Sequence, residues 1–109
     1  MHLSAPAKIV TPPKSVVAKL DSSVEFYVLA TGWPRPDVVW LHNDERINVD
    51  DGAGDFGVET AECADGNELA VESLLVVRRV TRATAGRFTV KVANEWDVER
   101  RDAQLTGLD

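Results

Sequence analysis

Cysteine is almost absent from this chain, because Cys63 is the only one among 109 residues. A single cysteine cannot form an internal disulfide, so the fold must be held together without a covalent cross-link. Acceptors for N-glycosylation are missing as well, since no asparagine is followed two residues later by serine or threonine. Both absences fit a reducing compartment, and we expect a cytoplasmic protein that does not need the secretory pathway.

Long apolar segments and dense positive charge are missing too. No apolar run approaches the ~20 residues needed to cross a bilayer, and the first residues lack the basic and apolar segments of a signal peptide. The formal net charge is −6, whereas nucleic acids and anionic membranes attract proteins with Lys and Arg concentrated on one face. We therefore predict no nucleic-acid binding and no membrane binding.

Side chains suited to catalysis are scarce. Neither histidine, His2 or His42, has a serine or cysteine near it in a nucleophile motif, so a catalytic triad is not expected. His42 and Cys63 cannot complete a metal site alone. Residues 48–59 resemble a calcium loop in spacing, but Ala53 stands where that loop requires glycine. We predict no enzyme activity, no metal and no cofactor.

The charge that is present is unevenly placed. Residues 44–72 carry ten acidic side chains and one basic side chain, whereas six arginines follow later: Arg78, Arg79, Arg82, Arg87, Arg100 and Arg101. This pattern predicts one acidic and one basic region. Two explanations stay open, a solvated surface that keeps the domain soluble or oriented docking to a charged neighbour.

Alternation of apolar and polar residues with period two dominates the chain, and no helical stripe lasts three turns. A chain of this length forms one domain, and the alternation predicts an all-β fold. The expected inward residues on successive strands are Val24, Phe26, Val28 and Ala30, then Val38 and Trp40, then Leu75 and Val77 followed by Val80, then Phe88, Val90 and Val92, with a last strand around residues 98–105.

Prolines and glycines punctuate these strands. Pro12 and Pro13 separate residues 8–10 from residues 16–17, so we expect an edge strand whose second half crosses to another sheet. Asp51-Gly52 and Asp65-Gly66 mark turns, and the second is expected to join two strands as a hairpin. Short strands at this spacing predict a two-sheet sandwich with Greek-key connections.

Two motifs resemble the intermediate-set (I-set) immunoglobulin domain. The first is Gly32-x-Pro34-x-Pro36-x-Val38-x-Trp40, similar to the family's first inter-sheet turn and core tryptophan. The second is Leu75-x-Val77-x-x-Val80 followed by Gly86-x-Phe88-x-Val90-x-Val92-x-Asn94. The resemblance implies a single immunoglobulin-like domain over residues 7–109 after a flexible segment at 1–6, with the core signature Val28, Trp40, Leu75, Phe88 and Val90.

Three departures from the family pattern carry expectations. Val28 and Val90 replace the bridge cysteines; the lost cross-link is worth about 4 kcal/mol and burial of two valines contributes roughly 3 kcal/mol, so the fold survives without oxidation. Phe88 replaces the corner tyrosine and Thr84 replaces an aspartate, which predicts a looser turn before Gly86. Asp97 replaces the glycine of the last hairpin and is expected in the left-handed conformation.

Domains without the bridge resemble those of titin, twitchin, obscurin and myosin-binding protein C. The resemblance implies a non-enzymatic module of a giant sarcomeric or cytoskeletal protein, monomeric in isolation, whose partners are other proteins or neighbouring immunoglobulin and fibronectin-type domains. The alternatives are an extracellular adhesion or receptor domain that has lost its bridge, and an enzyme or a regulatory segment tethered to a kinase.

Two groups of side chains are candidates for partner contacts. Trp33 and Trp96 lie in turns that meet at one end of an immunoglobulin sandwich; they either fold over the domain rim or anchor a neighbour. The second group consists of outward positions that are expected side by side on one sheet, Tyr27, Leu29, Leu74 and Val76. Lysine and arginine stems could cover that group instead.

Two weaker candidates complete the set. Val39 and Leu41 form a smaller apolar group on the opposite sheet. Residues 48–72 are acidic and rich in glycine, and we expect a mobile loop followed by a hairpin. Recruitment of a basic partner by that loop is a hypothesis.

Overall fold

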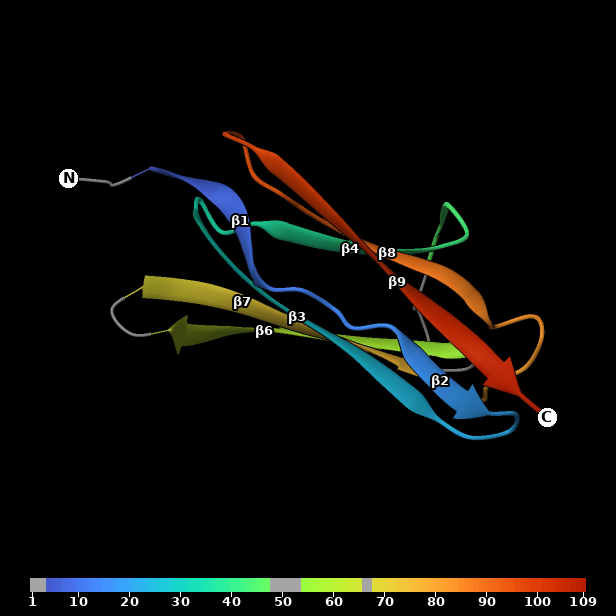
Figure 1. The fold of residues 1–109 in the computed structure, drawn as a ribbon. Helices are drawn as coiled ribbons and strands as arrows, with labels where there is room; N and C mark the ends of the chain where they lie inside the picture. Colours follow the sequence, from blue (N-terminus) through green and yellow to red (C-terminus); the bar gives the residue numbers. More distant parts are fainter. Residues whose placement is uncertain (1–3, 48–53, 66–67) are drawn as a thin grey trace.

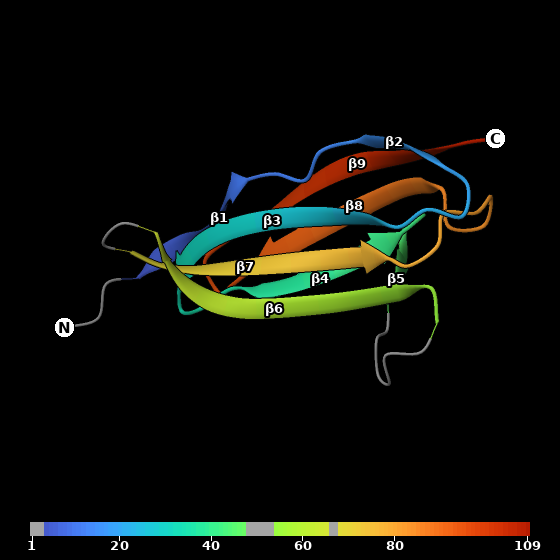
Figure 2. The same cartoon turned by 90° about the horizontal axis from the view of Figure 1, so that it is seen from below.

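The computed structural model describes residues 4–47, 54–65 and 68–109, and these residues form two β-sheets packed face to face (Figures 1 and 2). One sheet has the order β1, β3, β7, β6 and the other has the order β2, β9, β8, β4, β5. Consecutive strands such as β3 and β4 lie in different sheets, as a Greek-key sandwich requires. The described residues contain no helix, and so none that could cross a membrane.

The four-stranded sheet is antiparallel throughout. Its strands are β1 (Ala5–Thr11), β3 (Val24–Trp33), β7 (Glu68–Val77) and β6 (Phe56–Asp65). Strands β6 and β7 pair over ten residues, from Phe56 opposite Val77 to Asp65 opposite Glu68. The hairpin expected at Asp65-Gly66 is therefore confirmed. The turn expected at Asp51-Gly52 and the loop around it lie outside the described residues.

The five-stranded sheet contains one parallel pair. Its strands are β2 (Val16–Lys19), β9 (Val98–Leu108), β8 (Gly86–Ala93), β4 (Asp37–His42) and β5 (Glu45–Arg46). Strand β2 runs parallel to β9, with Val16 opposite Leu105, whereas β1 pairs with β3 in the other sheet. The switch of the first strand from one sheet to the other at Pro12-Pro13 is therefore confirmed. Strand β1 begins at Ala5, two residues before the expected boundary at residue 7.

The predicted core signature is buried between the sheets. The five signature residues have at most 2% of their surface exposed, and Val28 and Val90 have none. Trp40 donates its indole Nε1–H to Ser73 Oγ at 2.9 Å, and Ser73 in turn bonds Thr60 Oγ1 at 2.9 Å. No buried side-chain polar atom lacks a partner in the described part of the chain. The alternation of the sequence therefore predicted most of the core correctly, although Val24 and Val38 are only half-buried and pack against its margin.

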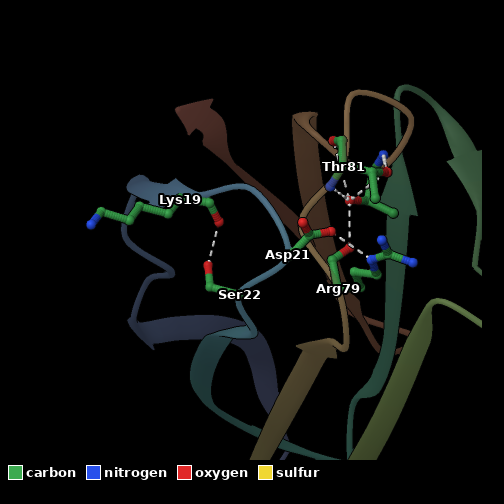
Figure 3. Close-up of polar contacts among 6 residues, drawn as sticks. Lys19, Asp21, Ser22, Arg79 and Thr81 are labelled. Atoms are coloured by element: carbon green, nitrogen blue, oxygen red, sulfur yellow. Dashed lines mark hydrogen bonds and ion pairs between the residues drawn. The ribbon is translucent and has the colours of Figure 1, made fainter. Parts of the chain in front are cut away.

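The turn before Gly86 is firmly bonded, contrary to the expectation of a looser turn. Thr84 Oγ1 accepts the Thr81 N–H at 2.8 Å and donates to the Arg79 carbonyl at 2.9 Å, while the Thr84 N–H donates to Thr81 Oγ1 at 3.1 Å. Arg79 also pairs with Asp21 at 2.7 Å, which ties this turn to the β2–β3 turn (Figure 3). The expectation was wrong because the short threonine side chain supplies both an acceptor and a donor.

The domain is elongated, with extents of 54 × 26 × 24 Å. The start of β1 and the end of β9 lie at opposite ends of the sandwich (Figure 1). The β3–β4 and β8–β9 turns share the end near the N-terminus, whereas the turn between β7 and β8 lies near the C-terminus. The two ends of the sandwich therefore present different loops.

Candidate functional site

The end of the sandwich beside β1 brings together three segments that are distant in sequence. They are the start of β1, the β3–β4 turn and the β8–β9 turn, and we call their combined surface the N-terminal end surface (Figure 1). Trp33 and Trp96 both belong to it, as the sequence predicted. Their side chains are 38% and 56% exposed.

Asn94 holds the N-terminal end surface together. Its Oδ1 accepts the N–H groups of Ala7, Trp96 and Asp97 at 3.2, 3.0 and 3.1 Å. Its Nδ2 donates to the carbonyls of Ala5 and Pro34 at 2.9 and 3.1 Å. One amide side chain thus connects all three segments, because it follows β8 at the point where they meet.

Close approach of the same segments explains Gly32 in the proline-rich motif. A Cβ atom built at this residue would lie 3.0 Å from the Pro36 ring, 3.1 Å from Ala7 Cα and 3.1 Å from Asn94 Nδ2. Its φ of 153° also belongs to the range that side chains other than that of glycine rarely adopt. The motif therefore specifies a tightly packed junction between β1, the β3–β4 turn and Asn94.

The β8–β9 turn differs from expectation at Asp97. Positive φ values occur at Asp21, Asn43 and Asp44 among the described non-glycine residues, and not at Asp97. The left-handed conformation expected there is wrong, because Asn94 closes the turn instead. The Asn94 N–H donates to the Asp97 carbonyl at 3.0 Å, in addition to the bonds made by its side chain.

Trp33 lies beside a small cavity on the side of the end surface that faces β6. Its neighbours around this cavity include Arg35, Glu62 and Val71. Arg35 and Glu62 form an ion pair at 3.0 Å, with both side chains about half exposed. Trp33 is thus partly supported by its own domain, whereas Trp96 is the more exposed of the two indoles.

The second candidate lies on the outer face of the four-stranded sheet and consists of Tyr27, Leu29, Leu74 and Val76; we call it the outer-face patch. Tyr27 lies directly opposite Leu74 across β3 and β7, so the predicted neighbours are brought together. Tyr27 is 38% exposed and the other three are half-buried.

Carboxylates interrupt and border this patch. Glu72 lies opposite Leu29, and its Oε2 accepts the Tyr27 hydroxyl at 2.9 Å. Glu25 lies opposite Val76 and Glu59 lies opposite Leu74. The surface is therefore apolar with an acidic border. On the other sheet, Val39 and Leu41 are half-buried.

The arginines of the second half of the chain do not form one basic region. Arg87 pairs with Asp44, Arg79 pairs with Asp21, and Arg78 donates to the carbonyls of Gly54 and Phe56. Two further arginines, Arg100 and Arg101, lie on β9. Arg78, Arg79 and Arg87 are therefore not part of a separate basic region, because the fold places each of them next to a carboxylate or backbone carbonyls.

No group of three or more metal-ligating side chains occurs in residues 4–47, 54–65 and 68–109. The pattern of the sequence did not predict that Asn94 organises the N-terminal end surface. Its one local signal was its position at the end of an alternating strand, where asparagine commonly bonds the backbone of a following turn.

A family model described as "Immunoglobulin I-set domain" matches residues 7–106. The chain is 28% identical over 97% of its length to "Titin homolog" of Caenorhabditis elegans. It is 28% identical over 92% of its length to the human "Leucine-rich repeats and immunoglobulin-like domains protein 1". It is also 28% identical over 94% of its length to "Muscle M-line assembly protein unc-89" of Caenorhabditis elegans. The chain spans 0%, 8% and 1% of the lengths of these three proteins.

Solved structures of titin domains share the fold. A chimeric titin Z1Z2 carrying an exogenous decorin peptide superimposes with a TM-score of 0.80 at 21% identity, covering 97% of this chain and 98% of that one. Titin domains Z1Z2 in complex with telethonin superimpose with a TM-score of 0.79 at 20% identity, covering 98% of this chain and 50% of that one. At these identities the likeness shows the fold alone.

Proposed function

The chain belongs to the immunoglobulin I-set family, and we propose that it is a non-enzymatic module of a giant sarcomeric or cytoskeletal protein, acting as a load-bearing spacer and a docking unit. The kinship with a titin homologue and an M-line assembly protein supports this proposal. The buried Val28 and Val90 support it too, because a domain that works in a reducing compartment cannot depend on a disulfide.

The observation that carries the proposal is the N-terminal end surface. Asn94 fixes three segments around the start of β1, and Trp96 projects from this scaffold with 56% of its surface exposed. Large aromatic side chains on rigid turns are favoured anchors at protein interfaces. We therefore assign this surface to the contact with a preceding immunoglobulin or fibronectin-type domain, and the outer-face patch to a second protein partner.

A two-domain fragment of the parent protein tests the first contact. Trp96→Ala should broaden the distribution of angles between this domain and the preceding one, measured by small-angle scattering and residual dipolar couplings. It should leave the melting temperature of the domain within about 2 °C. An unchanged distribution in the Trp96→Ala fragment would contradict the assignment.

Val98→Ala serves as a matched control, because Val98 is 48% exposed and follows the same turn without projecting from its tip. Leu74→Glu is the corresponding test for the outer-face patch. It should abolish a partner contact on that patch and leave the interdomain angles unchanged. The extracellular alternative predicts a signal peptide and cysteine-paired domains in the parent chain.

A further inference from the structure

The four sheet edges of this domain differ in how well they are protected against strand addition. Exposed edges in native proteins are normally shortened, bent by bulges, or blocked by proline or lysine. Strand β2 has four residues and β5 has two. Strand β1 contains Pro6 and two register irregularities. Strand β6 has ten residues, an unbroken register with β7, and neither proline nor lysine.

A hydrogen bond at the start of β6 shows which of its residues direct their backbone N–H and C=O groups toward β7 and which direct them away. The Arg78 N–H donates to the Asp55 carbonyl at 2.9 Å, so this pair exchanges bonds across the β6–β7 ladder. Backbone groups alternate along an antiparallel strand, so Gly57, Glu59 and Ala61 also bond to β7. The N–H and C=O groups of Val58, Thr60 and Glu62 therefore point away from β7, on the side of β6 where the described residues place no neighbouring strand.

A groove lies beside this edge, between β6 and β4 of the other sheet. Thr60 lines it on one side, and Val38, Val39, Arg35 and Arg46 line it on the other. Strand β4 offers a shorter edge. Alternate residues of β4 bond to β8, and the Trp40 carbonyl bonds to Ile47, so the backbone groups of β4 that face the groove are those of Val38 and the Trp40 N–H. The edge of β6 is therefore the longer template for a strand entering the groove.

Charge indicates what kind of strand fits. Glu59 is exposed on the outer side of β6, and none of the ion pairs among the described residues includes it. No lysine or arginine occurs between residues 54 and 65. Arginines from other elements do reach this edge: Arg35 pairs with Glu62, and Arg46 lines the groove, so Glu59 is the carboxylate on which the charge argument depends. A second copy of this chain, with a net charge of −6, would add carboxylates to this edge. A basic partner would neutralise them.

We propose that β6 is a docking edge for an extended, basic segment of another protein, which pairs with Val58, Thr60 and Glu62. Its residues facing the groove are apolar, because they meet Val38 and Val39, and its residues on the outer side are basic, because they lie beside Glu59. This is recognition by strand addition, in which the backbone provides affinity and alternate side chains provide specificity.

A synthetic peptide with four lysines alternating with three valines is the probe. Hydrogen exchange measured by NMR should slow about tenfold at the amides of Val58, Thr60 and Glu62 when the peptide is added. The amides of Gly57, Glu59 and Ala61 should be slow with and without it. Unchanged exchange at the first three amides in millimolar peptide would overturn the proposal. So would protection of those amides by raised domain concentration alone, which would mean self-pairing.

Backbone methylation of the peptide provides a test that does not change the domain. In antiparallel addition the valine N–H groups face β6 and the lysine N–H groups face solvent, and in parallel addition these roles are exchanged. Methylation of one set should therefore weaken binding at least about tenfold, while methylation of the other set has little effect. Equal binding of both methylated peptides would overturn strand addition.

Substitutions in the domain separate the backbone contribution from charge. Glu62→Pro removes one outward N–H, which an edge strand tolerates, and should weaken peptide binding about tenfold. Glu62→Ala, which loses the same carboxylate but keeps the N–H, should change it less than about threefold. Glu59→Lys should weaken binding of the lysine peptide and strengthen binding of the analogue in which glutamate replaces lysine. Binding unaffected by both Glu62→Pro and Glu59→Lys would overturn the assignment to β6.

Discussion

At the scale of single residues, Asn94 has the largest influence on the candidate site. Its side chain makes five hydrogen bonds, to the backbone of β1, the β3–β4 turn and the β8–β9 turn. Each is modest, but together they position Trp96 relative to the start of the chain. The exposed indole can act as an anchor because its turn is fixed beforehand, which lowers the entropic cost of binding.

Asn94→Ala should lower the free energy of unfolding by about 1 to 2 kcal/mol, because the part-buried Ala7 N–H and four more exposed backbone groups lose their partner. Urea denaturation monitored by tryptophan fluorescence measures this loss. Asn94→Asp keeps the acceptor for the three N–H groups and loses the two donations, so we expect a smaller loss. Equal stability of Asn94→Ala and the unmodified domain would show that solvent replaces these bonds.

Sequence reasoning succeeded and failed at this scale for different reasons. Alternation predicted that Phe26, Val28 and Val90 are buried. Successive side chains of a strand point to opposite faces, so the local sequence is enough to tell which of them face the core. The bonds of Asn94 to Ala5 and Ala7 cross almost the whole chain, with separations of 89 and 87 residues. Such contacts exist only once the two sheets are packed, so no local pattern contains them.

At the scale of elements, the β7–β8 turn is held by a threonine hydroxyl at the position where the family pattern has an aspartate carboxylate. Thr84 is buried, and its hydroxyl serves as acceptor for Thr81 and donor to Arg79. The sequence indicated only that an aspartate was missing, and the compensation depends on a side-chain rotamer that sequence does not fix. The strand edges are a similar case, because exposure of β6 depends on which strands become neighbours.

Thr84→Val keeps the shape of the side chain and removes the hydrogen bonds of the hydroxyl, of which those with the Thr81 N–H and the Arg79 carbonyl are the shortest. We expect a loss of about 2 kcal/mol in unfolding free energy and faster hydrogen exchange at the Thr81 amide. Thr81→Val removes the acceptor for the Thr84 N–H and a longer contact of 3.4 Å between the two hydroxyls, and should cost about half as much. If the two variants lost equal stability, the reciprocal bonding would not be what holds the turn.

At the scale of the whole molecule, the placement of the chain ends decides how force would act. The start of β1 and the end of β9 lie at opposite ends of the elongated domain, and β2 runs parallel to β9 (Figure 1). Pulling on the two ends would therefore load the β2–β9 bonds together, in shear. The Leu20 N–H donates to the Leu108 carbonyl at 2.8 Å. Because backbone groups alternate in direction along a strand, the Ala18 N–H also faces β9 and the Val17 N–H faces away from it.

Ala18→Pro should increase the rate of unfolding under force about tenfold, since it removes one of the bonds loaded in shear. Val17→Pro is the matched control, because the N–H that it removes points to solvent and its side chain is 64% exposed. Single-molecule pulling of both variants, embedded between reference domains, measures the difference. Equal unfolding rates would mean that the mechanical barrier lies elsewhere in the sandwich.

The aliphatic pair at Val28 and Val90 determines how much chain such a domain can release. A disulfide at those positions would keep the segment between them folded back on itself after rupture. Without it, all 109 residues become extensible, to roughly 370 Å at full stretch. Because the folded domain spans 54 Å, one unfolding event would lengthen the tether by roughly 300 Å, and refolding would recover that length with no redox chemistry.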